Sequence, residues 1–169
     1  MKKRTFLWAA IAMGGSAVLT RHQWRDSQEM AFSNPQTGSK SFELNKTEQE
    51  WRQILTPEEF RVLRQHGTEQ AGSSPLDQEY GQGTYVCAGC DLPLFASETK
   101  YNSGTGWPSF WDPLDNAVGT TTDKSFLMVR TEVHCRRCGG HLGHVFLDGP
   151  KPTGKRYCMN GAALKFLPA

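Results

Sequence analysis

The stretches Cys87-Ala88-Gly89-Cys90 and Cys135-Arg136-Arg137-Cys138 each place two cysteines three positions apart. Two such pairs are the ligand set of a closed tetrahedral zinc site, in which every thiolate lies about 2.3 Å from the metal. The spacing therefore predicts one structural zinc ion per chain, bound by Cys87, Cys90, Cys135 and Cys138. Because the pairs are far apart in the chain, the metal would close a long loop and staple the fold.

Two other chemistries use the same residue pattern. The pairs could form two disulfides, which would suit an exported protein, or one pair could be a redox-active dithiol. His134 adjoins Cys135 and is a possible substitute ligand, but with four cysteines available we expect an ordinary surface residue. Four thiolates leave no open position on zinc, so a zinc site here is structural and any catalytic chemistry lies elsewhere.

The composition limits the class of protein. A chain of 169 residues has length for one domain of ordinary size plus appendages. Lys and Arg number 19 and Asp and Glu 17, so the formal charge is only +2, and we expect no nucleic-acid partner. A hydrophobic fraction of 37% is that of a soluble protein and not of a multi-span membrane protein.

The first twenty residues differ from the rest. Basic Lys2-Lys3-Arg4 precedes an apolar run over 6–19, and a helix of that length would span about 22 Å, short of a ~30 Å hydrocarbon core. We therefore predict an export signal or anchor at 1–20, with transient membrane contact, and a flexible linker at 21–45. The location would be periplasmic, lumenal or membrane-attached; a cytosolic protein with an apolar N-terminus is the alternative.

Two capping boxes predict short helices ahead of the cysteine pairs. The first, Thr47-Glu48-Gln49-Glu50, opens a helix with Trp51 and Ile54 on one face. The second, Thr56-Pro57-Glu58-Glu59, has proline at the first helical position and opens a helix that stops at Gly67. We expect both helices to cover a core.

Short apolar runs between glycines and prolines follow from Gly83 onward. They predict strands at 84–86, 94–95, 125–133, 145–147 and 162–167. The fold class is therefore mainly β (α+β): two small antiparallel sheets with N-terminal helices, stapled by a zinc site of four cysteines, over residues 46–169.

Cys158 is the cysteine that remains once the two pairs are assigned, and it lies in Arg156-Tyr157-Cys158-Met159-Asn160. A lone cysteine near histidines is a candidate nucleophile or redox centre. Arg156, His141 and His144 would bring positive charge, which lowers the pKa of a thiol and favours the thiolate. The two histidines are three positions apart, and the glycines around them allow a bent path that brings both side chains to one cavity.

Three stretches join the cysteine pairs in a specific order: Gly106-Trp107-Pro108-Ser109-Phe110, then Gly140-His141-Leu142-Gly143-His144-Val145-Phe146, then Arg156-Tyr157-Cys158-Met159-Asn160. From about Trp51 to the C-terminus, the chain resembles the methionine sulfoxide reductase B family. The resemblance implies a peptide-methionine (R)-S-oxide reductase, which reduces methionine-R-sulfoxide, free or in oxidised proteins, to methionine.

Sulfoxide reduction needs a thiolate that attacks sulfur and an acid that protonates the departing oxygen. With Cys158 as nucleophile, the first product on the protein is a sulfenic acid. The resemblance implies that His144 acts as the acid or binds a water molecule, and it places Asn160 beside the reacting groups.

The substrate methyl group needs an apolar wall. The resemblance places Trp107 against this methyl group, and Trp111 or Phe110 would extend the wall. It also implies that an acidic residue, here Asp148, orients His144.

The chain departs from the family pattern at two positions. Thr105 stands where many relatives have a resolving cysteine, so Cys158 has no partner outside the zinc set and must be recycled by an external reductant, a thioredoxin-like protein or a small thiol. Gly161 replaces a common serine. Two other functions stay open: a non-catalytic zinc-ribbon binding module, for which only Arg136-Arg137 supplies basic residues, and a thiol-disulfide oxidoreductase that uses one cysteine pair.

Overall fold

The computed structural model describes residues 42–124 and 129–169. The predicted export segment, residues 21–41 of the predicted linker and residues 125–128 of one predicted strand lie outside these ranges. Within them, no helix is long and apolar enough to cross a membrane.

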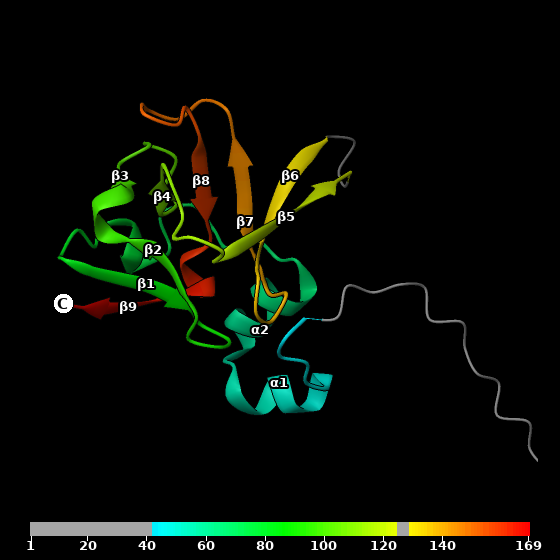
Figure 1. Ribbon diagram of the computed structural model, residues 1–169. Helices are drawn as coiled ribbons and strands as arrows, with labels where there is room; N and C mark the ends of the chain where they lie inside the picture. The colour runs from blue at the N-terminus through cyan, green and yellow to red at the C-terminus, as the bar shows by residue number, and fades with distance from the viewer. Residues whose placement is uncertain (1–41, 125–128) are drawn as a thin grey trace, which may run out of the picture. The chain divides into compact units, whose positions relative to one another are not determined.

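Both helices begin at the predicted capping boxes (Figure 1). Helix α1 (Glu48–Ile54) follows Thr47 and helix α2 (Pro57–Gln65) follows Thr56; each threonine side chain accepts from the N3 backbone N–H, and the N3 glutamate accepts from the threonine backbone. Two details were wrong. Ile54 is 54% exposed, so it does not share the buried face of Trp51. The left-handed residue that ends α2 is His66 (φ 54°), one position before Gly67.

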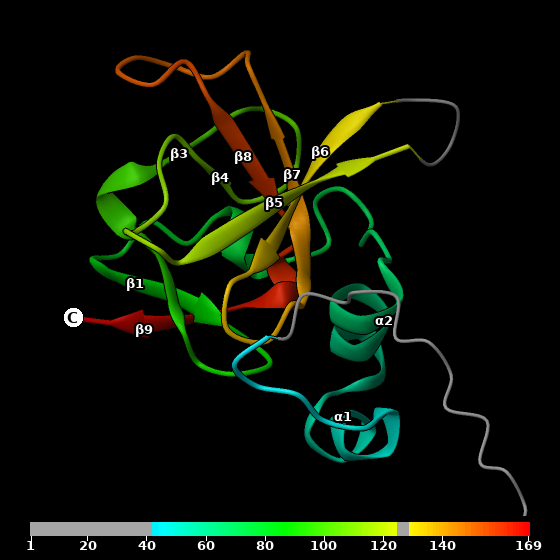
Figure 2. The ribbon, with the colours of Figure 1, turned by 45° about the vertical axis from the view of Figure 1, so that its right-hand side comes forward.

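The described strands form two antiparallel sheets, as predicted (Figures 1 and 2). The first sheet has the order β2-β1-β9, and the second has the order β3-β4-β8-β7-β6-β5. The strands of the first sheet are β1 (Gly83–Cys87), β2 (Pro93–Ala96) and β9 (Leu164–Pro168). Those of the second are β3 (Lys100–Tyr101), β4 (Ser109–Phe110), β5 (Val118–Asp123), β6 (Arg130–Cys135), β7 (His141–Phe146) and β8 (Arg156–Met159).

The pairing of the second sheet positions the lone cysteine. Cys158 lies on β8 between β4 and β7, opposite Ser109 on one side and His144 on the other. Directly opposed residues of an antiparallel pair project to the same face of the sheet. The chain thus brings Cys158 and His144 to one face although they are distant in sequence.

An aromatic core lies behind that face. Phe110 and Phe95 are fully buried, and their rings stack with centroids 4.3 Å apart. Tyr85 packs edge-on against Phe110 at 4.9 Å. Helix α2 adds Val62 and Leu63 to the core and contacts β7, which carries both histidines of the site. The helices therefore cover the core, as expected.

Candidate active site and zinc centre

The four paired cysteines converge at the ends of strands from both sheets. Their sulfur atoms all lie within 4.8 Å of one another, with Cys87 Sγ 3.7 Å from Cys138 Sγ and Cys90 Sγ 3.5 Å from Cys135 Sγ. A tetrahedron with metal–sulfur bonds of about 2.3 Å has edges of about 3.8 Å. All five cysteines are free thiols, so the disulfide alternative is not realised. The arrangement fits the predicted structural zinc ion.

Residues beside the second cysteine pair are packed more closely than expected. His134 is only 9% exposed, and its ring packs edge-on against Phe42, so its assignment as a surface residue was wrong. The thiol cluster does not include it. Leu44, within the predicted linker, donates its backbone N–H to the Arg137 carbonyl at 2.9 Å.

A separate cavity of about 130 Å³ contains most of the predicted catalytic residues. Four of the predicted residues line it, namely Cys158, His144, Trp107 and Asn160. Thr68, Arg130, Gly143 and Phe146 complete the lining. Gly143 is required for the close approach of β7 and β8, because a Cβ atom there would lie 2.1 Å from the Cys158 carbonyl oxygen.

The Cys158 thiol is partly buried, and burial determines its protonation. Burial raises the pKa of Cys158, while the charge of Arg156 and a hydrogen bond from Thr105 lower it by less. Arg156 and Cys158 are two apart on β8 and therefore share a face. The expectation that neighbouring positive charge gives a net lowering of this pKa was wrong, because desolvation of a thiolate outweighs that charge. The raised pKa favours the protonated thiol over the thiolate.

A hydroxyl chain leads to this thiol. Thr105 Oγ1 lies 4.0 Å from Cys158 Sγ and 2.8 Å from Ser103 Oγ, which is 2.7 Å from Ser109 Oγ. Thr105, the position at which the family resemblance implies a resolving cysteine, therefore faces the nucleophile. A hydroxyl there can hydrogen-bond to sulfur but cannot form a disulfide.

The acidic partner of His144 is Asp123 and not Asp148. His144 Nε2 lies 2.9 Å from Asp123 Oδ2, and burial lowers the pKa of His144 although the Asp123 hydrogen bond opposes this. Asp148 instead accepts two hydrogen bonds from the Arg156 guanidinium, at 2.9 and 2.8 Å. The prediction for Asp148 was wrong because the loop after β7 turns back toward β8, whereas β5 carries Asp123 to the histidine.

His141 lies behind His144 and not at the thiol. It is 3% exposed and is absent from the lining of the 130 Å³ cavity, but it lines an adjoining cavity of about 310 Å³ together with His144. The two ring centroids are 5.4 Å apart. An irregular register between β6 and β7 at Val133/His134 provides the bent path that allows this approach.

Glu132 joins His141 to His66, and neither Glu132 nor His66 was predicted. Its Oε1 lies 2.7 Å from His141 Nδ1 and 3.0 Å from His66 Nδ1. These two hydrogen bonds hold the pKa of Glu132 well below its usual range. The three side chains are close enough to share a metal ion, but two hydrogen bonds to a single oxygen account for the spacing. No local sequence pattern marks Glu132, because its role depends on strand pairing.

Phe110 does not extend the apolar wall. It is fully buried behind the sheet, because adjacent residues of a strand point to opposite faces and Ser109 faces the thiol. Phe146, under the Arg156 guanidinium at 4.4 Å, lines the cavity with Trp107 instead.

The comparisons with known proteins agree with this geometry. The SelR domain model matches residues 55–168. The chain is 55% identical over 127 residues to the peptide methionine sulfoxide reductase MsrB of Leptospira interrogans, an alignment that covers 75% of this chain and 97% of that protein. It is 51% identical over 126 residues to the protein of the same name from Agrobacterium fabrum (74% and 93%), and 50% identical over 133 residues to peptide methionine sulfoxide reductase B1, chloroplastic, of Arabidopsis thaliana (78% and 66%).

The SelR domain model spans both the thiol cluster and the Cys158 cavity. The alignment with the Leptospira protein covers nearly the whole length of that protein. The chain belongs to the SelR domain family.

Proposed function

We propose that the chain reduces methionine-R-sulfoxide, free or in proteins, to methionine, with Cys158 as the nucleophile. The observation that carries this proposal is the 130 Å³ cavity, in which one thiol meets His144, Asn160 and the indole of Trp107, apart from the thiol cluster. Zinc, when bound to its four thiolates, stabilises the fold and takes no part in the reaction.

The first step transfers oxygen from the substrate to the enzyme. Cys158 Sγ attacks the sulfoxide sulfur and forms a sulfur–sulfur bond. The sulfur–oxygen bond of the substrate and this sulfur–sulfur bond then break, and the oxygen becomes bonded to Sγ, so the products are a thioether and a Cys158 sulfenic acid. Atoms and electrons balance, because the thiol proton ends on the departing oxygen. A resting thiol suits this step, since attack and protonation together consume one S–H group.

The other lining residues supply binding and proton transfer. Trp107 gives an apolar face for the methyl group, and Asn160 offers a fixed polar group beside the reacting atoms. His144 is held by Asp123, and burial lowers its pKa, which favours the neutral imidazole; this ring can relay the proton. His141, held by Glu132, packs against the His144 ring from behind, and Arg156 favours the thiolate as the S–H bond breaks.

The second half of the cycle uses a reductant from outside the chain. The sequence has five cysteines and four belong to the thiol cluster, so the sulfenic acid has no internal partner. One external thiol forms a mixed disulfide and releases water, and a second thiol releases Cys158 as a thiol and leaves as a disulfide. A thioredoxin-like dithiol or two small-thiol molecules would both balance this step.

Separate R and S epimers of an acetylated methionine sulfoxide, with dithiothreitol as reductant, test the proposal. We expect consumption of R alone, its abolition in Cys158→Ser, and unchanged zinc content in that variant. Full activity in Cys158→Ser, or equal use of both epimers, would refute the assignment.

The composition of residues 1–20 supports a second proposal, that the protein is exported. Cell fractionation and the mass of the mature N-terminus test it. An intact N-terminus found only in the cytosolic fraction would count against export.

A further inference from the structure

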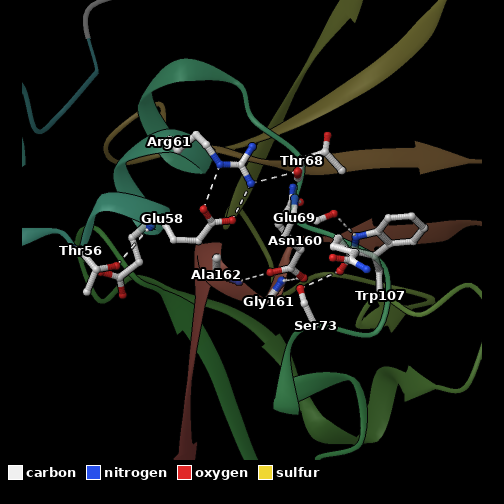
Figure 3. A network of polar contacts seen from close by, with 12 residues as sticks. Thr56, Glu58, Arg61, Thr68, Glu69, Ser73, Trp107, Asn160, Gly161 and Ala162 are labelled. Carbon is white, nitrogen blue, oxygen red and sulfur yellow. Dashed lines mark hydrogen bonds and ion pairs between the residues drawn. The ribbon is translucent and has the colours of Figure 1, made fainter.

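Glu69 makes four hydrogen bonds to Asn160, Trp107, Gly161 and Ala162 (Figure 3). It does not line the 130 Å³ cavity itself. Its carboxylate accepts from the backbone N–H groups of Gly161 at 2.6 Å and Ala162 at 2.8 Å. Its own backbone N–H donates to Asn160 Oδ1 at 2.9 Å. Its carbonyl oxygen accepts from Trp107 Nε1 at 3.3 Å. One residue therefore contacts two separate walls of the site.

The carboxylate takes the place of a missing local cap. Gly161–Ala163 forms a short 3-10 turn (η4), and Asn160 before it provides no side-chain hydrogen bond to the turn. The Asn160 amide is used elsewhere, because Nδ2 donates to the Leu142 carbonyl at 3.0 Å. The first N–H groups of such a turn need acceptors. Glu69 supplies them from a segment that is distant in the sequence.

A buried carboxyl group at this place is costly and needs a reason. Glu69 is 5% exposed, and burial raises its pKa while the hydrogen bonds from Ala162 and Gly161 oppose the rise. Burial of an acidic group is destabilising unless its oxygens are hydrogen-bonded. An apolar side chain would fill the same space without that cost, so the two acceptor oxygens are the feature that this position uses.

Both walls held by Glu69 face the nucleophile. Asn160 is two residues after Cys158, and Trp107 lies in the loop whose Pro108 carbonyl accepts from the Met159 N–H at 2.9 Å. With Glu69 in place, the amide of Asn160 is fixed through both its oxygen and its nitrogen, and the indole is tied to the same backbone. Small displacements of such groups cost large factors in rate.

We propose that Glu69 is a positioning residue for sulfoxide reduction: its carboxylate, bonded to the Gly161 and Ala162 N–H groups, holds the backbone of residue 69, whose N–H and carbonyl set Asn160 and Trp107 relative to the Cys158 thiol. This inference rests on the proposed function. Glu69→Gln keeps the shape but replaces one acceptor oxygen with an NH₂ group that faces a backbone N–H. Glu79→Gln is the matched control, because Glu79 also accepts a backbone N–H, from Gly81 at 2.6 Å, and lies away from the cavity.

The experiment measures kcat and KM for the R-sulfoxide and the ¹H–¹⁵N indole resonance of Trp107, which Trp107→Phe identifies. We expect Glu69→Gln to lower kcat/KM by about 10- to 100-fold and to shift the indole resonance, with zinc content retained and Glu79→Gln unaffected. If Glu69→Gln fails to fold, Glu69→Asp keeps the charge with a shorter reach and should show a smaller loss of the same kind.

Three results would overturn the inference. Wild-type kinetics in a folded Glu69 variant would do so, and so would an equal loss in Glu79→Gln. A loss of activity that disappears once the data are corrected for the folded fraction, with an unmoved indole resonance, would leave only a structural role. Failure of the proposed function is distinct, because the wild-type protein would then not reduce the R-sulfoxide at all.

Discussion

A serine at position 161 should be poorly tolerated because of Ser74. A Cβ atom on Gly161 would lie 1.9 Å from Ser74 Oγ and 2.4 Å from Ser74 Cβ. Ordinary contacts begin at about 3.4 Å, so the Ser74 side chain would have to move by roughly 1.5 Å. That movement would also strain the hydrogen bond that Ser74 Oγ accepts from the Leu76 N–H at 3.2 Å.

The cost of Gly161→Ser follows from these contacts. Overpacking of a filled site costs about 1–3 kcal/mol, and a weakened cap adds to it. We expect a loss of about 2 kcal/mol in the free energy of unfolding, or roughly 8 °C in Tm at about 4 °C per kcal/mol. Activity should fall as well, because the Gly161 N–H is bonded to Glu69.

A double-mutant cycle in the zinc-loaded protein tests this account. Ser74→Gly alone should cost only a few tenths of a kcal/mol as a cap substitution. In the Gly161→Ser/Ser74→Gly protein the overlap is gone, so we expect a favourable coupling energy of at least about 1 kcal/mol and a recovery of activity. Additive effects in urea or thermal unfolding would show that Ser74 is not what the new side chain meets.

Three further perturbations address the zinc site, the recycling of Cys158 and the loss of stability at low pH. Chelation of zinc should lower Tm sharply, and zinc alone should restore it; an unchanged Tm would contradict a structural metal. Thr105→Cys would bring a second sulfur near Cys158, so turnover with substrate but no reductant should leave this variant with a disulfide and two fewer titratable thiols, whereas wild type keeps a sulfenic acid. Because His141 and His66 depress the pKa of Glu132, its contribution to stability is present above the ordinary carboxyl range, about pH 4.5, and is lost as pH falls toward the folded-state pKa. Glu132→Gln should therefore lower stability at neutral pH and flatten its fall in acid, as measured by urea unfolding across pH.

The parts of the fold that could be predicted from sequence have local causes. A capping box satisfies helix N–H groups within four residues, so both helix starts were predicted correctly at Thr47 and Thr56. The two cysteine pairs fix their own ligand geometry in the same way. Strand β5 was missed because Val118–Asp123 is threonine-rich and has no fully buried residue, so it lacks the apolar alternation that marks a strand.

Sequence motifs identified those site residues that themselves line the cavity. The predictions failed for residues whose position depends on how the strands pair. Asp123 and Glu132 come from β5 and β6, and only the register of the sheet brings them to the histidines. Phe110 was wrongly placed at the cavity because Ser109, the adjacent residue of β4, is the one that faces the thiol. Asp148 was wrongly placed at His144 because the loop after β7 carries it toward β8. Burial is also non-local, which is why the direction of the shift in the Cys158 pKa could not be obtained from its charged neighbours.

That pKa shift bears on how the reaction begins. A thiol with a lowered pKa would be ionised at rest, and the sulfoxide oxygen would then need a proton from another acid. Here burial keeps the proton on Cys158 and also lowers the pKa of His144, so the site holds one proton near the sulfur and a neutral imidazole that lines the same cavity. The proton that the departing oxygen requires is thus already present on the nucleophile. It follows that negative charge on Sγ need develop only as the S–H bond breaks during attack, when Arg156 and the hydroxyl of Thr105 can stabilise it.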